Sequence, residues 1–366
     1  MRILHFYEPP SHGVPNYVNF LSANQRRQGH DSRVIGPSQP NSDPRWATDL
    51  SISRRSPKSL LRAGHAVNDL ASRFEADVVH VHSFFSGVSM RLAPASTPVV
   101  YTPHAWGFER RAVSAPLERA MVNGFAQVAC VSDAASASGA ERLKLQVPVD
   151  TIGSAIDLDR FSPTGPIPEA AKALQPYVVC VGRISKQKGQ LDLAREWQSQ
   201  MATSSHNLVI VGDGHPELTA YPHREGNVHF VGASTDVQGW IRGSEFAVQP
   251  SRWEAMSLVT IEALACGRSV LATDVAGMTE AISDLPHEPA GTVVENIAEL
   301  VSAAAARFDD QLLVQRERNA ARGRAEGLYS PDALVERSVQ IYARAAGIPI
   351  DITTSATTTQ ATEAAA

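Results

Sequence analysis

The sequence predicts an α/β protein built from two doubly wound domains, each with a parallel sheet covered by helices. Short runs of β-branched residues alternate along the chain with longer segments of helical period, which is the pattern of parallel sheets. A proline-rich stretch near the middle separates two sets of these runs. The 366 residues, 43% of them hydrophobic, are enough for two hydrophobic cores.

Each set of apolar runs is expected to supply one Rossmann-like sheet, because short apolar runs bounded by turn residues are typical of buried strands. In the first half we expect strands at residues 2–7, 31–36, 77–82, 98–104 and 127–132, followed by 149–156. In the second half we expect them at residues 177–182, 207–212, 228–232, 246–251 and 269–274.

Residues 161–176 connect the two sets. They hold four prolines and one glycine, so they are expected to form neither a strand nor a long helix. This linker gives an N-terminal domain over residues 1–163 and a C-terminal domain over residues 164–329. The two sheets are expected to face each other across a central cleft.

The end of the chain has two parts. Residues 330–347 have the period of an amphipathic helix, with Ser330 as N-cap and Pro331 at the first helical position. We expect this helix to return to the N-terminal domain. Residues 352–366 have low complexity and no apolar periodicity, which predicts a disordered tail.

Composition excludes several classes of protein. The net charge of -5 argues against a nucleic-acid binder. No apolar run approaches the roughly 20 residues of a membrane span, and no signal peptide is recognised, so we expect a cytoplasmic protein. Cys130, Cys180 and Cys266 lie far apart in apolar surroundings, which indicates buried reduced thiols and neither a metal site nor a disulfide.

The loops after the strands are the expected place for a ligand. Arg183 and Lys188 follow the strand that ends at Gly182, where two cations and free N–H groups suit a diphosphate, although a solvated basic loop would look the same. Gly212 follows the next strand. It marks either a tight turn or a nucleotide-contacting loop, and the third glycine of a dinucleotide fingerprint is replaced by Glu217, which disfavours a nicotinamide enzyme.

Two glutamates lie eight positions apart in the apolar segment SRWEAMSLVTIEALACG. We expect Glu254 in a loop and Glu262 on a helix that starts near Ser257 and stops at Gly267. Carboxylates accept hydrogen bonds from vicinal hydroxyls, so Glu262 is a candidate for binding a ribose and Glu254 for binding a sugar, with the helix N-terminus facing a diphosphate. The alternative is a pair of surface glutamates on an amphipathic helix.

The motifs together resemble a known family. RISKQKG, VGDG, VHFVG and PSRWEAMSLVTIEALACGRSVLATDVAGMTEAI, in this order, look like the C-terminal domain of the retaining GT-B glycosyltransferases of family GT4. The resemblance continues N-terminally in SHGVPNYVNFLSANQRRQGHDSRVIG, DVVHVHSFF, VVYTPHAW and VACVSDAASA. It covers roughly residues 1–345 and implies a GT-B fold.

Roles for individual residues follow from this resemblance. It implies that Gly13 approaches the donor phosphate, that His104 lies beside the transferred sugar and leaving phosphate, and that Arg183 and Lys188 neutralise the diphosphate. It assigns the sugar hydroxyls to Glu254 and the ribose to Glu262. The other implied donor-binding positions are Gly212, Val231, Gly232, Ala255, Met256, Ser257, Leu258 and Val259, of which Val231 and Gly232 would approach the base.

The implied activity is transfer of a sugar from a UDP- or GDP-sugar to a hydroxyl of a glycan or lipid-linked acceptor, with retention, in cell-envelope or exopolysaccharide synthesis. We identify no D-x-D metal clamp after a strand, so no metal ion or other cofactor is expected. A GT-B epimerase and a non-catalytic nucleotide-sugar binding protein remain alternatives. The basic segment 54–74 either contacts the inner face of the membrane or packs on its own domain.

This chain departs from the family pattern at two places. His12 stands beside Gly13 where the family has paired glycines, and the family's E-G-F-G reads E-A-M-S from Glu254 to Ser257. Alanine and serine still permit a helix start there, but Met256 reshapes the sugar pocket. The identity of the donor therefore does not follow from the resemblance.

Overall fold

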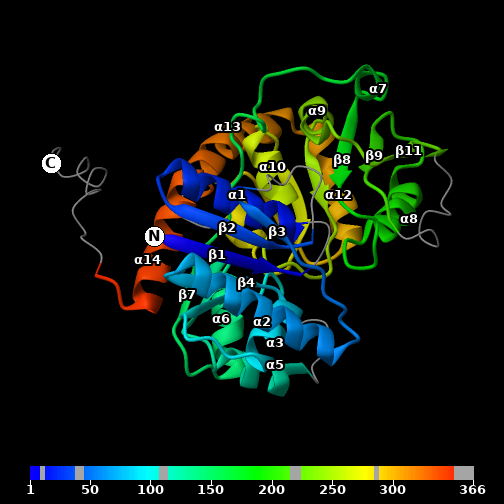
Figure 1. The fold of residues 1–366 in the computed structure, drawn as a ribbon. Coiled ribbons are helices and arrows are strands. Elements are labelled where there is room, and N and C mark those ends of the chain that lie inside the picture. Colours follow the sequence, from blue (N-terminus) through cyan, green and yellow to red (C-terminus); the bar gives the residue numbers. More distant parts are fainter. Residues whose placement is uncertain (9–12, 38–44, 107–113, 215–223, 284–287, 350–366) are drawn as a thin grey trace, which may run out of the picture.

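The computed structural model describes residues 1–8, 13–37, 45–106, 114–214, 224–283 and 288–349. Within this part the chain forms two sheets with helices on their faces, as predicted, and each sheet has seven strands (Figure 1). The expectations about His12 and about the tail at residues 352–366 concern positions outside the described residues. No described helix combines the length and apolar character that crossing a bilayer requires.

The N-terminal sheet has the order β3-β2-β1-β4-β5-β6-β7, and all its neighbouring strands are parallel. Its strands are β1 (Arg2–Tyr7), β2 (Asp31–Gly36), β3 (Ala47–Asp49), β4 (Val78–His82), β5 (Val99–Thr102), β6 (Gln127–Cys130) and β7 (Val149–Thr151). Its helices are α1 (Gly13–Arg27), α2 (Pro57–Phe74), α3 (Phe84–Leu92), α5 (Ala115–Val122) and α6 (Asp133–Leu143).

The C-terminal sheet has the order β10-β11-β9-β8-β12-β13-β14 and is parallel except for β10. Its strands are β8 (Tyr177–Val181), β9 (Asn207–Val211), β10 (Arg224–Glu225), β11 (Val228–Gly232), β12 (Ala247–Gln249), β13 (Val270–Thr273) and β14 (Gly291–Val294). Its helices are α7 (Glu169–Lys172), α8 (Gln190–Met201), α9 (Val237–Gly243), α10 (Leu258–Ala265), α11 (Met278–Ile282), α12 (Ile297–Asp309) and α13 (Gln311–Leu328).

Every predicted strand is present, although the last one of the first half is reduced to the three residues of β7. Three short strands, β3, β10 and β14, are not foreseen. β3 is largely exposed and therefore lacks the apolar run that identifies a buried strand. The three cysteines are buried free thiols, as expected.

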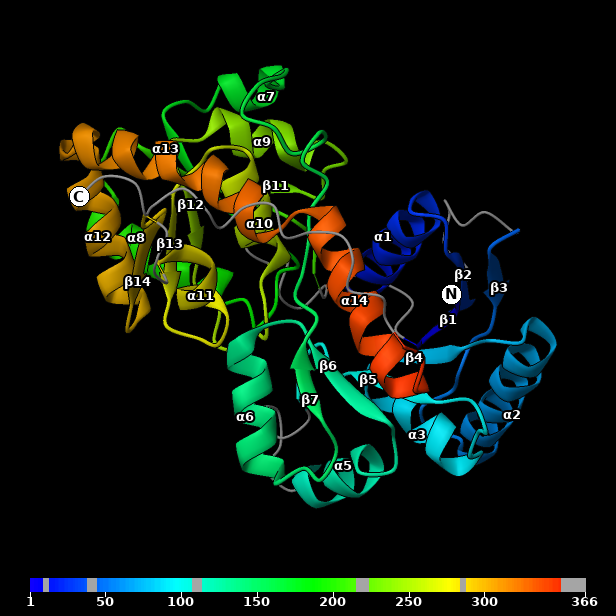
Figure 2. The same cartoon turned by 90° about the vertical axis from the view of Figure 1, so that its left-hand side faces the viewer.

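Helix α14 (Pro331–Ala346) links the end of the chain to its beginning. Ser330 is its N-cap and Pro331 occupies the first turn. The helix leaves the C-terminal domain and packs against α1 and strands β4, β5 and β6 of the N-terminal sheet (Figure 2). Its buried side chains Leu334, Val335, Ile341 and Tyr342 belong to the N-terminal core.

Both sheets reverse their strand order at one place, between β1 and β4 and between β8 and β12. In open parallel sheets, ligands bind beyond the carboxyl ends of the strands at such a switch point. The loops after β4, β5, β8 and β12 are therefore the segments that the fold makes available for a ligand.

Candidate active site

His104 lies just beyond the end of β5, where the sequence predicts it. Its φ of 52° is in the left-handed region that few residues with a side chain adopt. The His104 Nε2 atom is 3.0 Å from His82 Nδ1. The His104 and Tyr17 rings pack nearly perpendicular to each other, with their centroids 4.9 Å apart. Burial lowers the pKa of His104 to about 3, so the imidazole is neutral at physiological pH.

Gly13 and Leu258 bring the two domains together at the starts of two helices. Gly13 is the first residue of α1, and Leu258 is the first residue of α10. A Cβ atom built at Gly13 would lie 3.8 Å from Leu258 Cδ1. Ser257 caps α10 by accepting from the N–H of Thr260. The N–H groups of Leu258 and Val259 are left without intrahelical acceptors, as at any helix start, so this point attracts anions.

Lys188 and Glu254 come from the loops after β8 and β12 and form an ion pair with 2.5 Å between Nζ and Oε1. Their side chains are 19% and 8% exposed. The Ser251 hydroxyl also donates to Glu254 Oε1 at 2.9 Å. The loops approach closely because Gly189, with φ of 69°, has no side chain: a Cβ there would lie 2.3 Å from the Pro250 carbonyl oxygen.

Glu262 lies on α10, and Glu254 precedes that helix, as predicted. Burial is the main cause that raises the pKa of Glu262 to about 7, and the charges of Arg160 and Lys188 oppose this rise. The Arg183 side chain is exposed beyond β8, and its guanidinium pairs with no carboxylate among the described residues. One cation of the predicted pair is therefore engaged with Glu254, and the other faces solvent.

Gly212, which follows β9, allows the ends of β8 and β9 to pack closely. Gly212 has φ of 150°, and a Cβ there would lie 2.1 Å from the Gly182 carbonyl oxygen. The Gly212 N–H donates to the Gly232 carbonyl at 2.8 Å. The close approach of the Gly182 backbone therefore requires a glycine at position 212, and a contact of Gly212 with a nucleotide stays a prediction. A Cβ at Gly232 would meet nothing within 4 Å, and Val231 is only partly buried.

Ala255 has a contact that the sequence did not reveal. Its carbonyl accepts a hydrogen bond of 2.6 Å from the Ser132 hydroxyl, and its side chain belongs to the core of the N-terminal domain. Beside it, Glu280 Oε2 of α11 accepts from the N–H groups of Asp133 at 2.9 Å and Ala134 at 3.4 Å. The start of α6 is therefore bonded to the C-terminal domain. Met256, next to Ala255, is partly buried and contacts both cores.

Asp157 and Asp159 have D-x-D spacing beyond the end of β7. The expectation that no such pair serves as a metal clamp stays a prediction. The Asp157 carboxylate is engaged in a turn, because Oδ1 accepts from the N–H of Asp159 at 3.1 Å and of Arg160 at 2.9 Å. Both aspartates are exposed. The turn itself explains the spacing.

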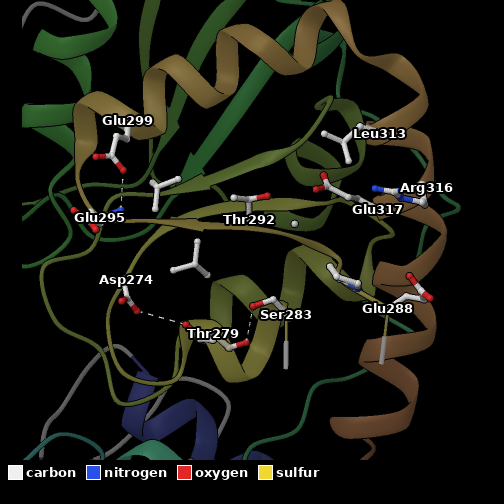
Figure 3. Close-up of a pocket in the computed structure, with 14 residues that line it drawn as sticks. Asp274, Thr279, Ser283, Glu288, Thr292, Glu295, Glu299, Leu313, Arg316 and Glu317 are labelled. Atoms are coloured by element: carbon white, nitrogen blue, oxygen red, sulfur yellow. Dashed lines mark hydrogen bonds between the residues drawn. The ribbon is translucent and has the colours of Figure 1, made fainter. Parts of the chain in front are cut away.

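A cavity of about 860 Å³ lies at the β13–β14 edge of the C-terminal sheet (Figure 3). Its walls include Asp274, Glu288, Glu295, Glu299 and Glu317, and contain none of the residues predicted for the site. Carboxylates repel a diphosphate, so this cavity does not suit the predicted ligand. The loops after β8 and β12 remain the better location.

Tyr17, His82 and the interdomain contacts were not assigned roles from the sequence. A signal for His82 does exist, because His80 and His82 alternate in β4 and so point to one face of the sheet. The helix-capping residues Ser132 and Asp133 are likewise readable as a helix start. The residues of the C-terminal domain that bond to Ser132 and Asp133 cannot be predicted from the sequence.

Two protein-family models match the chain. A model described as Glycosyltransferase Family 4 matches residues 11–160, and one described as Glycosyl transferases group 1 matches residues 175–310. The chain is 25% identical to an uncharacterized 41.2 kDa protein in the cps region of Klebsiella pneumoniae, over 93% of this chain and 99% of that protein.

Two further proteins are similar to the chain. The lipopolysaccharide core biosynthesis mannosyltransferase LpsB of Rhizobium meliloti is 31% identical, but the match spans only 48% of this chain and 54% of the enzyme. The crystal structure of Anabaena Alr3699/HepE in complex with UDP and glucose has a TM-score of 0.76 at 17% identity, over 93% of this chain and 98% of that one. This last likeness concerns the fold, which is GT-B.

Proposed function

Because this chain belongs to the group 1, family 4 glycosyltransferases, we propose that it transfers a sugar from a nucleoside diphosphate sugar to an acceptor hydroxyl. The acceptor would be a glycan or lipid-linked glycan of the cell envelope, in keeping with the lipopolysaccharide and cps-region relatives. The observation that carries this proposal is the meeting of Lys188, Glu254 and the start of α10 at the switch point of the second sheet.

The diphosphate would bind between Lys188, Arg183 and the N-terminus of α10. Lys188 is held near this point by Glu254, and a diphosphate would compete for the same ammonium group. Binding would then release the Glu254 carboxylate to accept hydrogen bonds from the sugar hydroxyls. In this way the ion pair holds Lys188 and Glu254 in place for their contacts with the sugar nucleotide before the sugar nucleotide binds.

We propose a reaction with retention and without a metal ion. The bond between the anomeric carbon and the leaving phosphate oxygen breaks, the acceptor oxygen bonds to the same face of that carbon, and its proton passes to the leaving phosphate. Lys188, Arg183 and the α10 N-terminus would stabilise the negative charge that develops on the diphosphate. Neutral His104 lends no positive charge and is suited to hydrogen bonding with the sugar.

The test begins with calorimetric titration of the purified protein with UDP, GDP, ADP and NAD in the presence of EDTA. We expect one nucleoside diphosphate to bind selectively. Lys188→Ala should weaken that binding by about tenfold, the value of one charge-assisted bond. Lys186→Ala is the matched control, because Lys186 is exposed in the same loop.

The binding result and an activity assay together separate the candidate functions. Binding of none of the nucleotides by the folded protein would contradict the proposal. Transfer from the matching sugar nucleotide to an acceptor distinguishes a transferase from an epimerase, which would release an isomerised donor without any acceptor. The anomeric configuration of the product, read by NMR, tests retention. Activity that disappears with EDTA would refute metal independence.

We also propose that the N-terminal domain contacts the membrane surface where a lipid-linked acceptor would lie. The apolar face of α2 is used inside the domain, since Leu60, Ala63 and Val67 are buried. The neighbouring helices α2, α3 and α5 nevertheless each expose a leucine: Leu61 is 39%, Leu92 46% and Leu117 60% exposed. These helices lie together on one side of the N-terminal sheet (Figures 1 and 2).

A further inference from the structure

A row of buried side chains continues from His104 into the N-terminal domain. His104 Nε2 is 3.0 Å from His82 Nδ1, and His82 Nε2 is 3.1 Å from His5 Nδ1. His5 Nε2 is in turn 2.9 Å from Gln25 Oε1. Gln25 belongs to α1, and its side-chain amide contacts α14. The candidate active site is thus connected to the C-terminal helix by hydrogen bonds.

At the end of this row that contacts α14, the donor and the acceptor of each hydrogen bond can be assigned. The Ser338 hydroxyl donates to the Val335 carbonyl at 2.7 Å, so its oxygen accepts from Gln25 Nε2 at 3.0 Å. The Gln25 carbonyl oxygen therefore faces the other way, where it also accepts from the Ser32 hydroxyl at 2.8 Å. A carbonyl oxygen only accepts, so His5 Nε2 must carry a proton.

The protonated nitrogen of each histidine determines which nitrogen is protonated on the next histidine. A neutral imidazole has one N–H and one lone pair, so His5 Nδ1 accepts and His82 Nε2 donates to it. His82 Nδ1 then accepts, and His104 Nε2 donates to it. Burial lowers the pKa of all three rings, which keeps each of them neutral. The remaining lone pair of His104 is on Nδ1.

A fourth buried histidine, His80, lies beside this row and has its own hydrogen-bond partners. The Thr102 hydroxyl donates to the Ala129 carbonyl at 2.6 Å, so it accepts from His80 Nε2 at 2.8 Å. His80 Nδ1 accepts from the Tyr342 hydroxyl at 2.6 Å. The ligand atoms of His5, His80 and His82 lie within 4.8 Å of one another, as a metal site would require. However, both nitrogens of each ring are already engaged in hydrogen bonds, so we interpret the cluster as a hydrogen-bond network.

We propose that Gln25, His5 and His82 are positioning residues that hold His104 as its Nε2–H tautomer, so that the Nδ1 lone pair accepts a hydrogen bond from a hydroxyl of the bound sugar. The sugar contact rests on the proposed function, whereas the tautomer follows from the network alone. Among the described residues none bonds to Nδ1, which leaves this atom for the substrate. His104 would therefore select a hydrogen-bond donor at that position of the sugar and would not bind phosphate as a cation.

The tautomer can be measured directly in the full-length protein. Two-bond proton–nitrogen NMR spectra of histidine-labelled protein distinguish the Nε2–H, Nδ1–H and doubly protonated forms of each ring. The signal that disappears in His104→Asn identifies His104. We expect the Nε2–H form at neutral pH. An Nδ1–H or doubly protonated His104 would overturn the inference, and this outcome depends on no other variant.

The role of Gln25 is tested by Gln25→Met, which keeps the size of the side chain and removes the acceptor. His104 is then expected to show a mixture of both tautomers. Thr102→Val is the control, because it removes the acceptor of His80 and leaves the row from Gln25 to His104 intact. An unchanged His104 spectrum in folded Gln25→Met would overturn the positioning role.

Kinetics adds a second readout once the donor is known. Gln25→Met should lower kcat about tenfold and change the KM for the donor by less than about twofold, as expected when an orienting hydrogen bond behind a site residue is lost. Equal kcat would overturn the role of the row in catalysis. The NMR measurement needs no substrate, so a failure of the proposed function would leave the tautomer result standing.

Discussion

Glu262 provides a direct test of the electrostatics of the site. Its pKa in the folded protein is about 7, against an ordinary value of 4.5, chiefly because burial disfavours the charged carboxylate. At about 1.36 kcal/mol per pKa unit the difference corresponds to roughly 3 kcal/mol. The side chain is partly exposed, so we discount this to about 1–2 kcal/mol for solvent screening.

The sign of the effect follows from the number of protons bound. Between pH 4.5 and 7 the folded protein holds a proton on Glu262 that the unfolded chain has lost, so this residue lowers stability as the pH rises through that window. Glu262→Gln cannot ionise and should remove this loss. We expect the variant to be more stable than the wild type by about 1–2 kcal/mol at pH 8 and nearly equal to it at pH 4.5.

Urea unfolding followed by tryptophan fluorescence measures this difference. Glu141→Gln serves as the control, because Glu141 is exposed on α6 and its substitution should leave the pH dependence unchanged. If the difference between Glu262→Gln and wild type is the same at pH 5 and pH 8, the reasoning is wrong. A ribose bound by the carboxylate would also lower its pKa, so nucleotide binding near pH 7 should release protons, which calorimetry in two buffers detects.

Two further predictions concern surfaces away from the reacting atoms. Leu117→Ser should reduce sedimentation with vesicles containing phosphatidylglycerol, whereas Leu312→Ser, at a residue 86% exposed on the C-terminal domain, should not; equal losses would contradict the membrane proposal. Glu280→Ala removes the acceptor for the N–H groups of Asp133 and Ala134 and should cost about 1 kcal/mol, with a larger radius of gyration in small-angle scattering. An unchanged scattering curve and urea midpoint would refute a role for Glu280 in holding the domains together.

The sequence predicted the strands well because buried parallel strands are continuous apolar runs, as in β4 and β8. It also placed the start of α10, since Ser257 is an effective N-cap and the apolar period begins directly after it. β14 was missed because only its first residue, Gly291, is buried, and the three residues that follow it in the strand are only partly buried. Edge strands of this kind lack a distinctive hydrophobic pattern.

The candidate site was predicted as a set of positions, but not as a set of contacts. Lys188 and Glu254 were expected to bind separate parts of a donor, and their ion pair depends on the tight approach of Gly189 to Pro250, two residues 61 positions apart in the chain. No local pattern specifies such an approach. The roles of these residues toward a donor stay predictions until a bound complex is measured.

The hydrogen bonds behind His104 depend on contacts between residues that are far apart in the sequence, so the sequence alone does not predict them. Alternation in β4 places His80 and His82 on one face, yet the direction of the bonds is decided by Ser338 on the last helix of the chain. A hydroxyl that donates within its own helix can only accept from Gln25, and every later donor and acceptor follows from that choice. Seating α14 on the N-terminal sheet therefore does more than bury apolar surface, since it determines which nitrogen of His104 is protonated.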